Sequence, residues 1–252
     1  MRSEVRSHDT NRLRRNLFNL RQLSSRAARI VCGNMSKSRF TTSAEYWERR
    51  YASGATSGAG SQNQFAEFKA KVINDFVRGR GIRDVIEFGC GDGNQLTLSE
   101  YPKYLGVDIS PSAVAACRSR FTGDASKQFM LLSEYAGQRA QLSLSLDVIY
   151  HLTEDAAFES YMGNLFDAAR EYVIIYSSDI DSRPGEWAPH VRHRAFTQWV
   201  DAHRPDWTVE ANISNPYPFD RDTQAGSLAD FHIYRRRGLD HEFGTPAGGV
   251  AS

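Results

Sequence analysis

The chain has 252 residues, 40% of them hydrophobic and 24% charged, a composition ordinary for one globular domain of about 200 residues with short extensions. No apolar run approaches the roughly 20 residues that a membrane-spanning helix needs. The net charge is +1, but residues 1–40 hold ten basic residues and two acids, so the rest carries about −7 and offers no electrostatic case for nucleic-acid binding.

The first segment, residues 1–42, is basic, and we expect a solvated, disordered arm. Two alternatives are a translation start at Met35, just before the first patterned segment, and an organelle-targeting peptide, a class rich in Arg and Ser. A long apolar core typical of a secretory signal is absent. Cys32, Cys90 and Cys117 show no CxxC spacing, which predicts a reducing, cytoplasmic compartment and neither disulfides nor a zinc site.

An organised domain is predicted over residues 43–238, followed by a disordered tail over 239–252. It begins with the aromatic segment 46–51 and a flexible loop of small residues over 53–61. Apolar residues then recur at helical spacing, which predicts an amphipathic helix over 63–78 that the glycines at 79 and 81 close. The apolar positions of this helix are Phe65, Phe68, Val72, Ile73, Phe76 and Val77.

Strands and helices then alternate, which predicts a doubly wound parallel sheet with helices on its faces. Ser110 is a plausible N-cap and Pro111 a first helical residue. The last two strands are joined by a Pro-rich, unhelical loop, so we expect an antiparallel finish. The expected strands are 84–88, 104–107, 128–132, 142–146, 172–176, 207–213 and 231–235, and the expected helices begin at 95 and span 111–121, 156–169 and 196–202.

The most informative segment is the loop after the first strand, which runs from Glu87 through three alternating glycines to Gly93. A second apolar strand then ends in Asp108. Ligands of open α/β sheets bind beyond the carboxyl ends of such strands, and glycines there permit tight turns and close backbone approach. The dinucleotide fingerprint G-x-G-x-x-G would need glycine at position 94, which is Asn94, so that reading is excluded.

The sequence E-F-G-C-G-D-G at residues 87–93 resembles the first motif of class I S-adenosylmethionine-dependent methyltransferases. Residues 145–152 resemble the fourth-strand segment of that family, and 46–51 resemble the helix that caps its cofactor. The resemblance covers residues 43–235. It implies an α/β, Rossmann-like fold with a mostly parallel seven-stranded sheet, an antiparallel last strand and helices on both faces.

The resemblance also implies a cofactor, S-adenosylmethionine, which is released as S-adenosylhomocysteine. Asp108 stands where the family places an acid that accepts both ribose hydroxyls, although a helix N-cap is the alternative for this residue. Glu134 follows the third strand, where the family contacts adenine, and Cys90 has packing as its alternative. The expected cofactor-binding residues are Trp47, Arg50, Glu87, Gly89, Cys90, Gly91, Gly93, Asp108, Ile109, Glu134 and Asp147.

Titratable residues follow the fourth strand, beside the expected position of the methyl group. His151 suits general-base work near neutral pH, although a histidine here can also serve only to hydrogen-bond nearby backbone. Asp147 could orient His151, contact the cofactor or cap the following turn. We expect His151 and Asp147 to be catalytic and Tyr150 to contact the substrate.

The loop after the fifth strand contains a second polar group. We expect Asp179, His190, Arg192 and Arg194 to bind the substrate, as a clamp for a phosphate, carboxylate or sugar acid, with a solvated loop as the alternative. His193 or His190 could be the base instead of His151. Asp147, His151 and Asp179 could together form a magnesium site, but their spacing is not diagnostic and we expect no metal.

These observations predict O-methylation of a small-molecule or glycan-like acceptor. The motif that methylates amino groups of nucleobases is absent after the fourth strand. One alternative is an RNA or protein methyltransferase that holds its target with the basic arm. The other is a scaffold protein that binds S-adenosylmethionine without catalysis.

Overall fold

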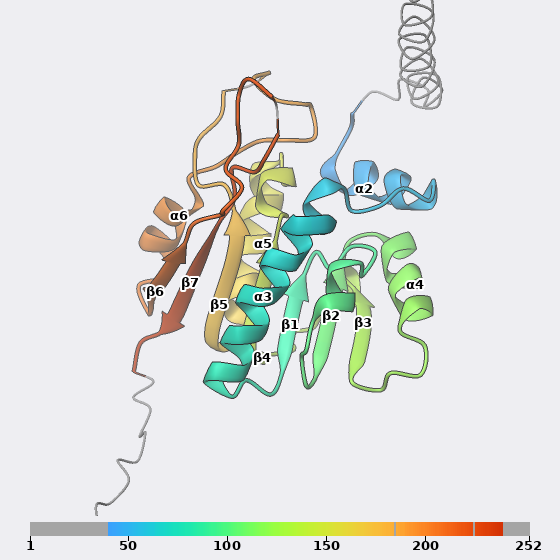
Figure 1. Cartoon of the computed structure of the whole chain (residues 1–252), viewed down its shortest axis with the longest axis vertical. Coiled ribbons are helices and arrows are strands. Elements are labelled where there is room, and N and C mark those ends of the chain that lie inside the picture. The colour runs from blue at the N-terminus through green and yellow to red at the C-terminus, as the bar shows by residue number, and fades with distance from the viewer. Residues whose placement is uncertain (1–39, 184, 224, 239–252) are drawn as a thin grey trace, which may run out of the picture. The chain divides into compact units, whose positions relative to one another are not determined.

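A computed structural model describes residues 40–183, 185–223 and 225–238. Its centre is a seven-stranded sheet in the order β3-β2-β1-β4-β5-β7-β6 (Figure 1). All neighbouring pairs are parallel except those of β7, which lies antiparallel between β5 and β6. The strands are β1 Val85–Phe88, β2 Tyr104–Asp108, β3 Lys127–Leu131, β4 Ala140–Leu146, β5 Ala169–Ser177, β6 Trp207–Ile213 and β7 Asp230–Arg236.

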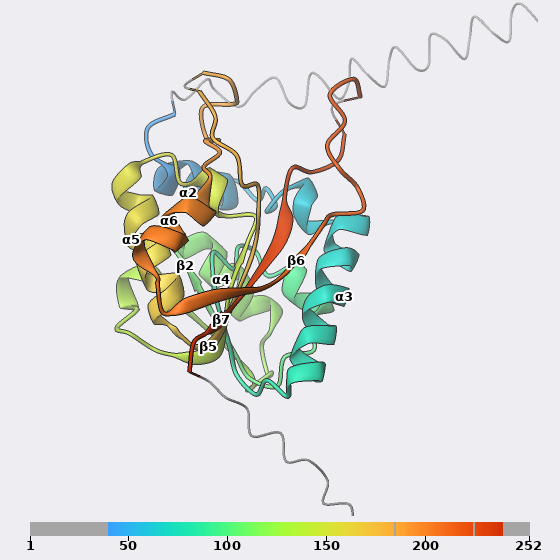
Figure 2. The ribbon, with the colours of Figure 1, turned by 90° about the vertical axis from the view of Figure 1, so that its left-hand side faces the viewer.

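Helices cover both faces of the sheet, and Figure 2 shows α3 on one side with α5 and α6 on the other. Residues of α3 and α4 share one hydrophobic core with the sheet, and residues of α5 and α6 share the second. The α-helices are α2 Ser43–Ala52, α3 Asn63–Arg80, α4 Pro111–Arg120, α5 Asp155–Asp167 and α6 Phe196–His203. The 3₁₀ helices are η1 Ala59–Ser61, η2 Gln95–Leu98, η3 Leu132–Glu134 and η4 Ile149–His151.

Local sequence signals explain where several helices begin and end. The Ser110 side chain accepts a hydrogen bond from the Ala113 amide, and Pro111 occupies the first turn, so α4 begins as expected. Gly81 ends α3 in the left-handed conformation with φ of 64°, which glycine adopts without a Cβ penalty. The arm expected over residues 1–42 lies outside the described residues apart from 40–42, as does the tail over 239–252.

One predicted helix is wrong. The segment from residue 95 forms only the four-residue η2. Asn74 of α3 explains the early end, because its side chain donates to the carbonyl of Leu98 and accepts from the amide of Glu100. Pro102 follows two residues later and disfavours helix at the residue before it.

Within the described part of the chain, no helix has the length and apolar character that crossing a membrane requires.

Candidate functional site

A cavity of about 440 Å³ lies at the carboxyl ends of β1, β2 and β4, where parallel sheets bind their ligands. Its volume falls within the range of small-molecule and cofactor sites. Of the residues selected from sequence, Trp47, Glu87, Gly89, Cys90, Asp108, Ile109, Asp147 and His151 line it.

The glycine loop after β1 forms one wall of this cavity. Gly89 and Gly91 have φ of 80° and 59°, a backbone conformation that side chains strain. The protein itself also crowds them, because a Cβ at Gly89 would lie 2.5 Å from the Val148 side chain and one at Gly91 would lie 2.5 Å from Ser57 Oγ. The glycines are therefore required by the closed fold of the loop as well as by any ligand.

Glu87, the penultimate residue of β1, is a buried carboxylic acid that lines the cavity. The Tyr104 hydroxyl donates a 2.7 Å hydrogen bond to its Oε2. Burial nevertheless dominates and raises the pKa of Glu87 to about 7. The acid thus stands near its ionisation point at neutral pH, where a cationic ligand group would favour the charged form.

Asp108 ends β2 and is also buried. Its Oδ2 accepts a 2.8 Å hydrogen bond from the Gly91 amide, and its Oδ1 accepts a 2.9 Å hydrogen bond from the Ser110 amide. Burial raises the pKa of this carboxyl. Since Ser110 is the N-cap of α4, Asp108 does not have that role, and each oxygen keeps acceptor capacity toward the cavity it lines.

Asp147 follows β4 in the left-handed conformation, with φ of 59°. Its Oδ2 lies 2.5 Å from the ammonium of Lys69, and its Oδ1 accepts a 2.8 Å hydrogen bond from the Tyr150 hydroxyl. Sequence reasoning missed Lys69. The signal was available, because Lys69 lies four residues from both Phe65 and Ile73 and so interrupts the apolar face of α3.

His151, in η4, lines the cavity as a neutral imidazole. Its Nδ1 lies 3.1 Å from the carbonyl oxygen of His190 and must donate, since a carbonyl only accepts. Burial lowers the pKa of His151 to about 4. The Trp47 ring meets it edge-on at 4.8 Å, so α2 and η4 close this end of the cavity together.

Helix α2 and the loop after it cover the glycine loop. Ser57 donates through Oγ to Asp92 Oδ1 at 2.9 Å, and the Tyr51 hydroxyl lies 3.0 Å from Ser57 Oγ. At the other end of α2, the Ser43 amide and hydroxyl donate to the carboxylate of Glu154, at 2.8 and 2.7 Å. The cover is thus fastened to the loops that follow β1 and β4.

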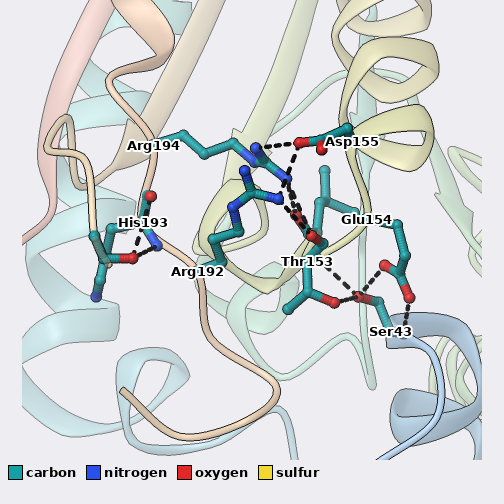
Figure 3. Close-up of polar contacts among 9 residues, drawn as sticks. Ser43, Thr153, Glu154, Asp155, Arg192, His193 and Arg194 are labelled. Carbon is teal, nitrogen blue, oxygen red and sulfur yellow. Dashed lines mark hydrogen bonds and ion pairs between the residues drawn. The ribbon is translucent and has the colours of Figure 1, made fainter. Parts of the chain in front are cut away.

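Arg192 and Arg194 do not line the cavity, and Figure 3 shows both side chains directed toward Thr153 and Asp155. Both guanidinium groups pair with Asp155 at the start of α5, at 2.9 and 2.7 Å. Both also donate to the carbonyl of Thr153, while Ser43 contacts the amide and hydroxyl of the same residue. The arginines therefore tie the loop after β5 to the start of α5 through Asp155 and Thr153.

The remaining selected residues do not line the cavity. The His193 ring is buried, with Nδ1 2.5 Å from Ser178 Oγ. Asp179 accepts hydrogen bonds from the amide and hydroxyl of Thr197 in α6. Glu134 accepts a hydrogen bond from the Leu131 amide. Arg50 donates to the carbonyl of Thr56. Gly91, Tyr150 and His190 hydrogen-bond to the lining residues Asp108, Asp147 and His151, respectively. Gly93 turns the glycine loop with φ of 71°. No group of three His, Cys, Asp or Glu side chains within the described ranges could hold a metal ion.

Comparisons with known proteins identify the fold. No protein-family model matches the sequence, and no curated protein is significantly similar to it. Among solved structures, N-methyltransferase NodS from Bradyrhizobium japonicum in complex with S-adenosylhomocysteine has a TM-score of 0.61 at 12% identity, covering 78% of this chain and 100% of that one.

Two other solved structures agree. Magnesium protoporphyrin IX methyltransferase ChlM from Synechocystis with bound S-adenosylmethionine has a TM-score of 0.55 at 13% identity, covering 80% of this chain and 100% of that one. A methyltransferase from Anabaena variabilis has a TM-score of 0.52 at 15% identity, covering 77% and 93%. The chain therefore has the Rossmann-like class I methyltransferase fold, which confirms the fold predicted from sequence.

Proposed function

We propose that this protein is an S-adenosylmethionine-dependent methyltransferase that O-methylates a small-molecule or glycan-like acceptor. The observation that carries the proposal is the pair of buried acids, Glu87 and Asp108, which flank a closed glycine loop on one cavity of about 440 Å³. A nucleoside linked to an amino acid offers ribose hydroxyls to one acid and an ammonium to the other.

The chemistry of the lining fits the parts of such a cofactor. Asp108 would accept from the ribose hydroxyls, because its carboxylate lines the cavity and the backbone amides that hold it do not use all of its acceptor positions. Ile109 and Leu132, which line the cavity beside Asp108, would flank the adenine. Glu87 would face the ammonium. Burial raises the pKa of this acid to about 7, and a bound cation would lower the pKa again and stabilise the carboxylate.

His151 is the base in this proposal. With Nδ1 donating to the His190 carbonyl, the lone pair is on Nε2, which has no hydrogen-bond partner among the described residues. The cofactor supplies an electrophilic methyl group on a sulfonium. The acceptor hydroxyl would lose its proton to Nε2 as its oxygen bonds to that methyl carbon, and the carbon–sulfur bond breaks with its electron pair on sulfur.

The acceptor class is supported by the scale of the site. Two loops, between β5 and α6 and between β6 and β7, rise above the carboxyl edge of the sheet (Figures 1 and 2). One structural neighbour acts on magnesium protoporphyrin IX, a small molecule. Because Arg192 and Arg194 are occupied by Asp155 and Thr153, we assign them no substrate anion.

Turnover assays test the proposal. The purified chain, S-adenosylmethionine and a panel of sugars and small hydroxyl compounds should release S-adenosylhomocysteine with at least one acceptor, and His151→Ala should lower kcat by about 10²-fold or more. Cofactor binding without turnover on small acceptors, RNA or protein would favour the scaffold alternative. Turnover only on RNA or protein, lost on deleting residues 1–40 and weakened by salt, would favour the arm-dependent alternative.

A further inference from the structure

Lys69 is a fully buried lysine in the wall of the cavity. It is the only lysine or arginine among the described residues of the lining, beside five acids, Glu87, Asp92, Asp108, Asp147 and Glu154. Lysine is rarely fully buried unless its ammonium is paired, because removing an unpaired ammonium from water is costly. A cation here is also unexpected in a site proposed to hold a sulfonium cation.

The ammonium of Lys69 is enclosed by protein groups. Its Nζ lies 2.5 Å from Asp147 Oδ2, and the side chains of the two residues are 1% and 13% exposed. The ammonium also lies 5.4 Å from the centre of the Tyr176 ring, so protein groups surround it. With so little exposed surface, Lys69 acts on a ligand through Asp147 and through its charge.

The loop after α2 closes on this pair. Gly60 lies so close to Asp147 that a Cβ there would be 2.9 Å from the same Oδ2 that Lys69 holds. Asp147 is therefore fixed by Lys69, by the Tyr150 hydroxyl and by the closed loop. Its carboxylate follows β4, beside the end of β1. A cofactor whose ribose binds Asp108 and whose ammonium faces Glu87 would hold its sulfonium between them, at this edge.

We propose that Lys69 is a positioning residue that sets the charge of the cavity. By neutralising Asp147, it prevents the site from holding the cationic cofactor much more tightly than the neutral product. This inference rests on the proposed cofactor. Its physical reason is that methyl transfer removes the positive charge from sulfur. An unpaired acid beside the sulfonium would stabilise the starting state more than the transition state and would slow the reaction.

The test compares two unreactive ligands in the same variant. Sinefungin carries a protonated amine in place of the methylsulfonium, and S-adenosylhomocysteine is neutral at that position. In Lys69→Met, the ratio of the S-adenosylhomocysteine Kd to the sinefungin Kd should rise roughly tenfold over wild type, the size expected for one added charge in a partly screened site. The control is Lys71→Met on the same helix, where an exposed pair with Asp75 is lost, and it should leave the ratio unchanged.

Two further variants keep the proposal open to refutation if Lys69→Met folds poorly. Asp147→Asn leaves the lysine charge alone and should lower the ratio roughly tenfold, and the Lys69→Met/Asp147→Asn double variant should return it to within about threefold of wild type. A ratio that stays within twofold of wild type in both single variants would overturn the role of Lys69. If wild type bound neither ligand, the proposed cofactor itself would be refuted.

Discussion

His151 Nδ1 donates to the carbonyl oxygen of His190 across 3.1 Å, and this contact joins two loops that are 39 residues apart. It selects one tautomer, so the basic nitrogen is Nε2 in a cavity wall. In the same environment, burial lowers the pKa of His151 to about 4. The contact with His190 therefore decides which nitrogen can accept a proton, whereas burial decides the pH range over which it can do so.

The first prediction concerns the acid limb of activity. A base with a pKa of about 4 stays neutral well below pH 6.5. Measured at saturating cofactor, where the ligand ammonium would hold Glu87 in its charged form, kcat should therefore remain nearly constant from pH 8 to about 5 and fall near pH 4. A kcat at saturating cofactor that instead halves near pH 6.5 would contradict the buried, neutral state of His151.

His151 should also affect stability in a defined direction. Its folded pKa lies below the ordinary value of 6.5, so the unfolded chain binds the proton more tightly, and stability is lost as pH falls from 6.5 toward 4. His151→Gln should lose less stability than wild type over that window, as urea unfolding at several pH values can measure. Equal losses in both proteins would count against the lowered pKa.

Glu87 should show the opposite dependence. Burial raises its folded pKa to about 7, above the ordinary 4.5, so its stabilising contribution is complete below pH 4.5 and disappears as pH rises through 7. Relative to Glu87→Gln, wild type should lose on the order of 3 kcal/mol of unfolding free energy between pH 4.5 and 8. Parallel pH profiles for the two proteins would show that Glu87 titrates normally.

The local parts of this site could be predicted from sequence because their partners are near in the chain. Gly89, Gly91 and Asp108 belong to one strand–loop–strand unit, and their clustering follows from the rule that ligands bind at the carboxyl ends of parallel strands. Ser110 and Pro111 likewise predict the start of α4, because the capping hydrogen bond and the proline both act within the first helical turn.

Other parts depend on partners that only the fold brings together. Lys69 meets Asp147 across 78 residues, and Arg194 meets Asp155 across 39. The sequence of residues 190–194 does not show whether its charged side chains contact a substrate or the start of a helix. The helix expected from residue 95 was wrong for a similar reason, because Asn74 takes the backbone groups that would extend it.

Arg194 and Arg192 give a matched pair for the structural role of their loop. The Arg194 side chain is 11% exposed and donates to the carbonyls of Leu152 and Thr153, so Arg194→Met should cost about 1–3 kcal/mol in unfolding free energy. Arg192 is 43% exposed, and Arg192→Met should cost less than about 1 kcal/mol. Urea unfolding of both variants decides the point, and an equal or reversed order would refute the assignment.

The glycine loop offers another comparison. Gly91→Ala adds a Cβ at positive φ, 2.5 Å from Ser57 Oγ and 2.8 Å from the Tyr51 hydroxyl, so it should destabilise the fold by roughly 1–2 kcal/mol or more and loosen the cover over the cavity. Gly79→Ala, in α3 with open space around it, should instead be neutral or stabilise by about 0.5–1 kcal/mol. Thermal unfolding with and without S-adenosylhomocysteine measures both effects, and similar behaviour of the two variants would contradict the packing described for Gly91.

The measurement that tests the central claim most directly is calorimetric titration of S-adenosylmethionine into wild type, Asp108→Ala and Asp167→Ala. Wild type should bind one equivalent. Asp108→Ala should bind at least about 30-fold more weakly, because it loses charge-assisted bonds to the ribose. Asp167→Ala, which removes an exposed acid at the end of α5 that pairs with Arg204, should bind like wild type. Absence of binding to wild type, or undiminished binding to Asp108→Ala, would contradict the account.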